Sequence, residues 1–314
     1  MRAILLADIG GTHSRFALAG TAGRPEHTVV IANDAVADLE TAVAHYLKDA
    51  GASPHAAVLA VAGPIEGEEV ALTNRTWRFR RDEFAKRFAL SRLRVVNDFE
   101  AIAWALPSLG PADTRPLGAD AKPREVTKAV VGPGTGLGVA ALLRLEGRWQ
   151  MMASEGGHAS FGAQADSEDE VFDRVRRECG GVVSAEAVLS GPGLLRLARA
   201  LDPQTTYREP EAIVTAALAR EPAALATARL FVRLLGRFAG GVALTFKAFG
   251  GVYVSGGVGR GLGPLLDEPQ FRAAFEMHPP HEQLLKTIPT LLVTYEEPGL
   301  LGCATLAKEF AAAV

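Results

Sequence analysis

Two glycine-rich turns, each carrying a threonine hydroxyl, are the segments of this sequence best suited to binding an anion. The first is Asp8-Ile9-Gly10-Gly11-Thr12, and the second is Gly132-Pro133-Gly134-Thr135-Gly136. Because glycine lacks a β-carbon, several backbone N–H groups of such a turn can approach one phosphate group. A tight hairpin without a ligand would use the same residues. The duplication favours phosphate binding, with each turn holding a different part of one polyphosphate.

An aspartate at an expected strand end accompanies the first turn. Asp8 closes the apolar run 3–7, and Mg²⁺ is usually bound by one or two carboxylates together with phosphate oxygens. We therefore expect Asp8 to support Mg²⁺ through water. Neither turn is followed by the Gly-Lys-Ser/Thr of a P-loop. Each is expected to continue into a strand, whereas a dinucleotide fingerprint opens a helix.

Asp98 is the best candidate for a proton acceptor. It comes directly after the apolar strand 93–96 and opens a predicted helix, with a second polar residue, Asn97, before it. Aspartate is also a favoured helix N-cap, a role that needs no ligand. From the pattern alone both interpretations stay open.

Three further polar residues could bind hydroxyl groups of a ligand. Glu155 and His158 flank two adjacent glycines, which allow the backbone to bend around a ligand. A carboxylate can accept two hydroxyl groups, and histidine can donate to or accept from one. A loop with a buried, hydrogen-bonded histidine would look the same. Glu186 is the third candidate, although a glutamate two residues after Ser184 is also ordinary near a helix N-terminus.

The elements that must position these residues alternate between strands and helices. Short apolar runs predict strands, and apolar residues at helical spacing predict helices. Strands alternating with helices are typical of an α/β fold with a parallel core to its sheet. Over the first hundred residues the expected strands are 2–8, 13–19, 28–31, 57–61 and 93–96, and the expected helices are 38–50, 82–88 and 98–105.

The pattern recurs in the middle of the chain. Strands are expected at 126–131, 137–143 and 148–152, and the second glycine turn follows the first of them. Both copies therefore read as a strand, a glycine turn, two further strands and then helices, which predicts two domains built alike. Between the copies, residues 107–123 contain four prolines and are expected to form a hinge. Residues 112–122 look like a linker that says nothing about substrate.

The last third of the chain is predicted to be mainly helical. Arg229, Arg233 and Arg237 recur every four residues and predict a solvent-exposed helix face, which argues against a membrane span. One strand leads into Gly256-Gly257, which an ordinary strand-to-helix turn would explain. The expected helices are 168–178, 190–201, 209–220 and 223–246, and the expected strand is 252–255.

Composition and charge exclude several classes of protein. With 314 residues, 48% apolar, and a net charge of −3, neither wholesale disorder nor binding to nucleic acid or an anionic membrane is indicated. Two distant cysteines, Cys179 and Cys303, form no CxxC pair and indicate a reducing compartment. The apolar start is cut off by Asp8 and is too short for a signal peptide. We expect a cytoplasmic, soluble protein with no nucleic-acid or membrane partner.

Six motifs follow one another along the chain: Asp8-Ile9-Gly10-Gly11-Thr12, Thr73-Asn74-Arg75-Thr76-Trp77, Asn97-Asp98-Phe99, Gly132-Pro133-Gly134-Thr135-Gly136-Leu137-Gly138, Glu155-Gly156-Gly157-His158 and Ser190-Gly191-Pro192-Gly193-Leu194. In this order they resemble the bacterial, ATP-dependent glucokinases of the proteobacterial type, members of the actin-like ATPase superfamily. The resemblance runs from Asp8 to Gly302, nearly the whole chain.

The resemblance implies a fold, a domain division and a site. The implied fold is α/β, with two ribonuclease-H-like (actin-like ATPase) domains and an interdomain cleft. Residues 1–108 with 299–314 would form the small domain and 109–298 the large one. Asp98 would be the catalytic base. The residues implied to bind sugar are Asn97, Asp98, Glu155, His158 and Glu186. Those implied to bind the nucleotide are Asp8, Ile9, Gly10, Gly11, Thr12, Gly132, Gly134, Thr135, Gly136, Gly256 and Gly257.

The sequence therefore predicts an ATP:glucose 6-phosphotransferase that uses ATP and Mg²⁺, in a cleft whose closure excludes water. A kinase for another hexose, such as mannose or an amino sugar, stays open. A sugar-sensing regulator is disfavoured because Asp98 is retained and no helix-turn-helix is expected before the first strand. Family members are often homodimers, so we expect one here.

Two details qualify the resemblance. His13 stands where glucokinases often have asparagine, which could alter contacts near the phosphate or the hinge. In the related ROK-type sugar kinases, a histidine in a segment like that of His158 helps to hold zinc with a cysteine cluster. Two distant cysteines cannot supply such a cluster, so zinc is not expected.

Overall fold

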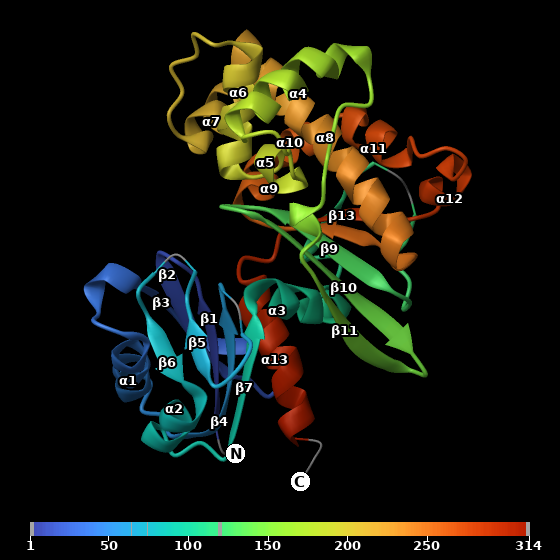
Figure 1. Cartoon of the computed structure of the whole chain (residues 1–314). Coiled ribbons are helices and arrows are strands. Elements are labelled where there is room, and N and C mark those ends of the chain that lie inside the picture. Colours follow the sequence, from blue (N-terminus) through green and yellow to red (C-terminus); the bar gives the residue numbers. More distant parts are fainter. Residues whose placement is uncertain (1–2, 64, 74, 119–120, 312–314) are drawn as a thin grey trace. The chain divides into compact units, whose positions relative to one another are not determined.

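The computed structural model describes residues 3–63, 65–73, 75–118 and 121–311. The chain divides into two compact units (Figure 1). Unit 1 comprises Met1–Leu109 and Glu296–Val314, and unit 2 comprises Gly110–Tyr295. Within the described ranges, no helix combines the length and the apolar character that a membrane span requires.

Unit 1 is built on a five-stranded mixed sheet in the order β3-β2-β1-β4-β7. The strands β1, β2 and β3 are antiparallel neighbours, whereas β1, β4 and β7 run parallel. Carboxyl ends of parallel strands meet at one edge of a sheet, so the residues that follow β1 and β7 lie at the same edge. The strand bounds are β1 Ala3–Ile9, β2 His13–Ala19, β3 Pro25–Ala32, β4 Pro54–Val61 and β7 Arg92–Asn97, with a separate hairpin of β5 Glu69–Ala71 and β6 Arg78–Arg80.

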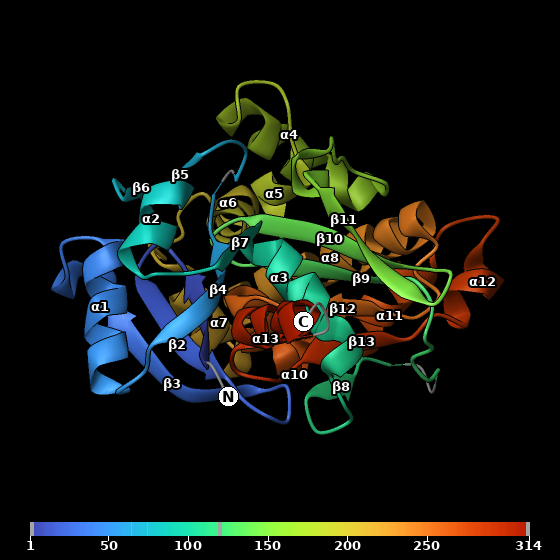
Figure 2. The same ribbon diagram turned by 90° about the horizontal axis from the view of Figure 1, so that it is seen from below.

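Helices cover both faces of this sheet, with α1 and α2 on one side and α3 and α13 on the other (Figure 2). This burial on both faces explains why β4 is an almost continuous apolar run. The expected helix after residue 38 begins there because the Asp38 carboxylate accepts the Thr41 N–H at 2.7 Å. The helix bounds are α1 Leu39–Asp49, α2 Arg81–Arg87, α3 Asp98–Ala105 and α13 Pro298–Ala311, with short 3-10 turns η1 Asn33–Ala35 and η2 Leu106–Ser108.

Unit 2 repeats the sheet topology of unit 1. Its six strands have the order β11-β10-β9-β12-β13-β8, in which β9, β10 and β11 are antiparallel neighbours and β9, β12 and β13 run parallel. The internal repeat inferred from the two glycine turns is thus present in the first five strands of each sheet. The strand bounds are β8 Thr114–Pro116, β9 Lys128–Pro133, β10 Leu137–Leu145, β11 Arg148–Ser154, β12 Val252–Val254 and β13 Thr290–Val293.

The long helix α8 is the centre of the helical layer of unit 2. Glycines on one face of α8 allow α11 to approach closely, because a β-carbon at Gly236 would lie 2.2 Å from the Phe271 carbonyl oxygen and one at Gly240 would lie 2.4 Å from that of Phe275. The bounds are η3 Gly156–His158, α4 Asp166–Glu178, α5 Ala185–Val188, α6 Gly191–Leu201, α7 Pro210–Leu218, α8 Pro222–Phe246, α9 Gly257–Gly261, α10 Gly263–Leu266, α11 Pro269–Glu276 and α12 Glu282–Lys286.

The prediction of a solvent-exposed arginine face on α8 is confirmed for Arg229 and Arg233, which are exposed, and is wrong for Arg237. Arg237 is buried, donates to the Glu168 carboxylate at 2.8 Å and lies over the Phe161 ring at 4.5 Å. Arg233 pairs with the other oxygen of the same buried carboxylate at 3.1 Å. A buried glutamate on the facing helix therefore neutralises two arginines of the stripe, and spacing along one helix cannot reveal such a partner.

Two further predictions about the chain path are also wrong. Residues 112–122 are more than a linker, because they contain β8, which pairs with β13, and Leu117, which is fully buried. The last third of the chain contains a second strand, β13, besides the expected one. Short strands are easily missed, because their apolar runs resemble pieces of buried helix.

Candidate active site

Asp8 and Asp98 lie at the same edge of the unit 1 sheet. The register of the parallel strands aligns Ile9 on β1 with Val61 on β4 and Asn97 on β7. Asp8 comes one residue before this aligned row, and Asp98 comes one residue after it. Ile9 is fully buried and anchors the end of β1. Two carboxylates are therefore brought to one edge from segments about ninety residues apart in the sequence.

Burial and mutual repulsion perturb both carboxylates. The pKa of Asp8 is raised to about 7, first by burial and then by the negative charge of Asp98, while Arg15 opposes the shift. Burial also raises the pKa of Asp98, against the opposing effect of backbone hydrogen bonds. Arg15 in turn pairs with Glu297 at 2.5 Å. Such a partly buried pair of carboxylates favours the approach of a proton or a cation.

The helix cap next to Asp98 is Asn97 and not Asp98. Asn97 Oδ1 accepts the Phe99 N–H at 2.9 Å, and Asn97 Nδ2 donates to the Gly63 carbonyl at 3.3 Å. The alternative interpretation of Asp98 as the N-cap is therefore wrong. Asp98 occupies the first helical position, where its Oδ1 lies 2.9 Å from the same Phe99 N–H. A carboxylate is stabilised near a helix N-terminus.

The first glycine turn connects β1 to β2. It is closed by the Gly10 N–H, which donates to the His13 carbonyl at 3.1 Å. Arg75 donates to the Gly11 carbonyl at 3.2 Å from the segment between β5 and β6. Asn74, part of the same predicted motif, lies outside the described residues. Asn33, which sequence reasoning missed, also contacts this turn.

The second glycine turn connects β9, which contains Gly132, to β10. The Gly134 N–H donates to the Gly136 carbonyl at 2.8 Å, and the Gly134 carbonyl accepts the N–H of Gly191, the first residue of α6, at 2.8 Å. A β-carbon at Gly134 would meet no atom within 4 Å, so one side of this turn is open. Thr135 lies at its tip. The motif that begins at Ser190 thus supports the turn from behind.

The three expected sugar-binding residues of unit 2 lie together beside this turn. Glu186 Oε2 accepts the Leu137 N–H at 2.9 Å, and Glu186 Oε1 lies 4.0 Å from His158 Nδ1. Glu155 Oε2 lies 3.7 Å from His158 Nε2. The Glu155 carboxylate and the His158 imidazole are mostly exposed, and Glu186 is partly buried. The cluster combines acceptors with an imidazole that can donate or accept, which suits a polyhydroxylated ligand.

Local structure explains how two of these side chains reach the cluster. Ser184 caps α5 by accepting the Ala187 N–H at 3.2 Å, which confirms that Glu186 lies in the first turn of a helix opened by Ser184. From that position Glu186 also accepts the Leu137 N–H. Gly156 and Gly157 form the 3-10 turn η3 that ends at His158. A β-carbon at Gly157 would lie 2.0 Å from the Leu137 carbonyl oxygen. Only glycine allows this close approach of η3 to the second turn.

The turn after β12 meets the base of the second glycine turn. Gly256 has φ +90°, and a β-carbon there would lie 2.5 Å from the Pro133 carbonyl oxygen. Gly257 begins α9, and a β-carbon there would meet no atom within 4 Å. The structure therefore brings Gly256-Gly257 beside Gly132-Pro133, as β9 and β12 are parallel neighbours.

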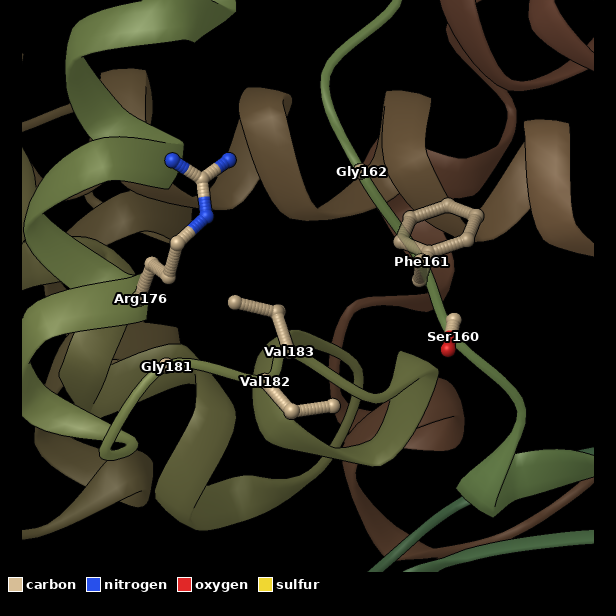
Figure 3. Close-up of a pocket in the computed structure, with 7 residues that line it drawn as sticks. All are labelled: Ser160, Phe161, Gly162, Arg176, Gly181, Val182 and Val183. Atoms are coloured by element: carbon tan, nitrogen blue, oxygen red, sulfur yellow. The ribbon is translucent and has the colours of Figure 1, made fainter.

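A cavity of about 340 Å³ lies elsewhere in unit 2 (Figure 3). Its walls come from the segment after η3, from Arg176 on α4 and from the loop that leads to α5. None of the predicted site residues lines it. We therefore do not assign the sugar to this cavity. The lining residues are Ser160, Phe161, Gly162, Arg176, Gly181, Val182 and Val183.

In the part of the chain that the structure describes, no group of three or more His, Cys, Asp or Glu side chains could hold a metal ion. Mg²⁺ needs fewer protein ligands when phosphate oxygens and water complete its coordination. The Asp8 carboxylate, whose pKa is raised by burial and by the negative charge of Asp98, fits a Mg²⁺ ion of this kind.

Comparison with known proteins gives consistent results. A family profile described as glucokinase matches residues 5–310. The glucokinase of Agrobacterium fabrum is 38% identical over 97% of this chain and 92% of its own length. The bifunctional protein glk of Burkholderia orbicola is 40% identical, but the chain spans only 48% of that protein. The crystal structure of a glucokinase from an Antarctic psychrotroph superposes with a TM-score of 0.88 at 34% identity, covering 98% of this chain and 99% of that chain.

Proposed function

Because the chain belongs to the glucokinase family, we propose that it transfers the γ-phosphoryl group of ATP to O6 of glucose, which yields glucose 6-phosphate and ADP. The chain spans about half the length of the bifunctional relatives that it matches. The observation that carries the proposal beyond family membership is the position of Asp98, a partly buried carboxylate beside Asp8 at one sheet edge.

Asp98 is the general base of the proposed reaction. A sugar hydroxyl becomes a better nucleophile when a positioned carboxylate accepts its proton as the new bond to phosphorus forms. Burial raises the pKa of Asp98, which makes it a stronger base than an exposed aspartate. Its place at the first position of α3, with Asn97 as the cap, holds the carboxylate in one orientation. Asn97 lies next to it and is proposed to bind a sugar hydroxyl.

The nucleotide is proposed to bind through the two glycine turns and Mg²⁺. Asp8 would hold the ion through water, and the ion would neutralise charge on the phosphate oxygens. The backbone N–H groups of Gly11, Thr12, Thr135 and Gly136 would donate to the phosphate groups, because those of Gly10 and Gly134 already donate within their own turns. Gly256 and Gly257 would lie on the adenosine side. Phosphoryl transfer depends chiefly on such positioning and charge stabilisation.

Glucose is proposed to bind through the cluster of unit 2 together with Asn97 and Asp98. Glu155 and Glu186 each place a carboxylate oxygen within 4.0 Å of the His158 imidazole, so the cluster supplies acceptors and one group that can donate. Because Glu186 also accepts the Leu137 N–H, the same side chain would join the sugar to the second phosphate turn.

These residues belong to different units, so the proposal requires both sets to act on one pair of substrates. The proposed fold is that of two actin-like domains, 1–108 with 299–314 and 109–298, which would close over glucose and ATP. Closure would keep water away from the phosphoryl group. A homodimer and a cytoplasmic location also stay predictions, and light scattering on the purified chain tests the first.

A coupled assay of ADP release tests the function. Glucose, mannose, glucosamine and N-acetylglucosamine would each be offered with ATP, ADP or polyphosphate as donor. Glucose with ATP should give the highest kcat/KM. A higher value for another hexose would reassign the substrate, and no transfer to any sugar would refute a kinase.

The variant Asp98→Asn tests the mechanism. The amide keeps the size of the side chain but cannot accept the proton, so kcat should fall by about 10²–10⁴-fold. Binding of glucose, measured by calorimetry, should remain. Glu66→Gln removes an exposed carboxylate of the same unit and serves as the matched control. Turnover near wild type in Asp98→Asn would remove Asp98 from the mechanism.

A further inference from the structure

Asn33 is a fully buried polar residue that contacts the first glycine turn from outside the six motifs. It follows β3 directly and begins η1. Its Nδ2 donates to the carbonyl oxygens of Gly10 at 2.8 Å and Gly11 at 3.1 Å. Its backbone N–H donates to the carbonyl of Thr12 at 2.9 Å. One residue thus holds three consecutive carbonyl groups of the turn.

The orientation of the Asn33 amide follows from its partners. Two carbonyl oxygens can only accept, so the group that faces them must be the NH₂. The Asn33 Oδ1 then accepts the Ser14 hydroxyl at 2.7 Å. Every hydrogen-bonding group of this buried side chain is therefore used in a way that only an amide permits. An aspartate would place an oxygen against two carbonyl oxygens.

Peptide geometry transmits this hold to the opposite side of the turn. In a planar trans peptide the carbonyl of one residue and the N–H of the next point in opposite directions. Since the carbonyls of Gly10 and Gly11 point to the buried Asn33 amide, the N–H groups of Gly11 and Thr12 point away from it. Neighbouring backbone N–H groups aimed to one side form an anion-binding concavity.

We propose that Asn33 is a positioning residue for phosphoryl transfer: its side-chain amide fixes the carbonyls of Gly10 and Gly11 so that the N–H groups of Gly11 and Thr12 face the phosphate chain of ATP. The inference rests on the proposed function for the identity of the anion. Donors that are fixed before the reaction need no reorganisation as charge develops on the phosphate. Asn33 itself touches no substrate.

The second turn is held in the same manner by a different donor. There the Gly134 carbonyl accepts the Gly191 N–H, so the Thr135 N–H points away from α6. In unit 2 a helix N-terminus supplies the donor, and in unit 1 a side-chain amide supplies it. Only the side-chain amide of Asn33 can be removed by a single substitution without changing the backbone.

The test compares Asn33→Ala with Asp38→Ala. Asp38→Ala removes the N-cap of α1 in the same unit and serves as a control for destabilisation alone. Calorimetry would measure the Kd of the non-hydrolysable analogue AMPPNP with Mg²⁺ and, separately, the Kd of glucose. In Asn33→Ala we expect the AMPPNP Kd and the KM for ATP to rise about tenfold or more, because two hydrogen bonds to the turn are lost. The glucose Kd should stay unchanged, and Asp38→Ala should change neither Kd.

The outcomes separate the inference from the proposed function. An unchanged AMPPNP Kd in folded Asn33→Ala, or an equal rise in Asp38→Ala, would overturn the positioning role. If Asn33→Ala does not fold, Asn33→Ser, which keeps one donor, is measured instead and should give a smaller rise in the same Kd; no rise would overturn the role. Should the wild type bind AMPPNP without phosphorylating glucose, the proposed function fails, while the Kd comparison still decides the role of Asn33.

Discussion

Replacing Asp8 by asparagine should make unit 1 more stable while weakening nucleotide-dependent activity. Burial and the nearby Asp98 charge raise the pKa of Asp8 to about 7. The folded chain therefore binds this proton more tightly than the unfolded chain does. Asparagine has nearly the same shape but no charge, so Asp8→Asn removes the penalty of an ionised, partly buried carboxylate.

The size and the pH window follow from linkage. A shift from 3.8 to about 7 corresponds to about 4 kcal/mol at 1.36 kcal/mol per pKa unit. Residual solvent contact of Asp8 screens part of this energy, so we expect about 2 kcal/mol. Because the raised pKa belongs to an acid, the wild type loses stability as pH rises from about 4 to about 7. The advantage of Asp8→Asn should grow over that interval and stay constant above it.

Urea unfolding in buffers without divalent cations measures this effect. Trp77 and Trp104 are both buried in unit 1, so a Trp149→Phe background makes tryptophan fluorescence report on unit 1 alone. Unfolding free energies at pH 5.5, 6.5, 7.5 and 8.5 would be compared with those of Glu68→Gln, which removes an exposed carboxylate of the same unit. Added Mg²⁺ with AMPPNP should stabilise the parent chain more than Asp8→Asn.

Two results would refute this reasoning. If Asp8→Asn is less stable than the parent at pH 8.5, the carboxylate is satisfied in the folded state and carries no penalty. If the difference is the same at all four pH values, it does not arise from the titration of Asp8.

Gly136→Ala should raise the KM for glucose, because its β-carbon would lie 2.6 Å from Glu186 Oε2 and displace that carboxylate. Gly134→Ala, which has open space around its β-carbon, should affect the KM for ATP instead. Steady-state kinetics on both substrates checks this difference, and equal effects of the two variants would contradict it. Arg237→Ala should lower the unfolding free energy of unit 2 by about 3 kcal/mol, because a buried carboxylate on α4 loses a partner. Arg229→Ala, at a more exposed ion pair, should cost below about 1 kcal/mol. Trp149 fluorescence in urea, in a background with Trp77→Phe and Trp104→Phe, measures both effects.

Much of the site could be predicted from local sequence. Glycines that follow an apolar run indicate a tight turn wherever the run lies in the fold, and the duplicated turn indicated the repeat that the two sheets share. Asp98 could be placed at a strand-to-helix junction for the same reason, since element type depends on residues only a few positions apart. The sequence did not show which residue of that junction caps the helix, because Asn97 and Asp98 are both good caps.

Long-range partners could not be predicted. Arg237 looks like part of a solvated face of α8 until Glu168, 69 residues away, is seen to pair with it. The β8 strand looks like linker until β13 is beside it. In each case the deciding contact comes from an element whose position depends on how whole faces pack, and no periodicity within one segment records that.

By itself, the sequence determined that this chain is an α/β protein with two glycine turns and the ordered motifs of a sugar kinase family. It also placed Asp8 at the end of one expected strand, for the phosphate, and Asp98 directly after another, for the sugar. The tertiary structure alone decided that Asp8 and Asp98 lie at one sheet edge and that Glu186 contacts both His158 and the second glycine turn. It also decided that the Asn33 amide donates to the first glycine turn. The physical reason is range: backbone preferences act over a few residues, whereas charge coupling and buried hydrogen bonds act between atoms that only packing brings together.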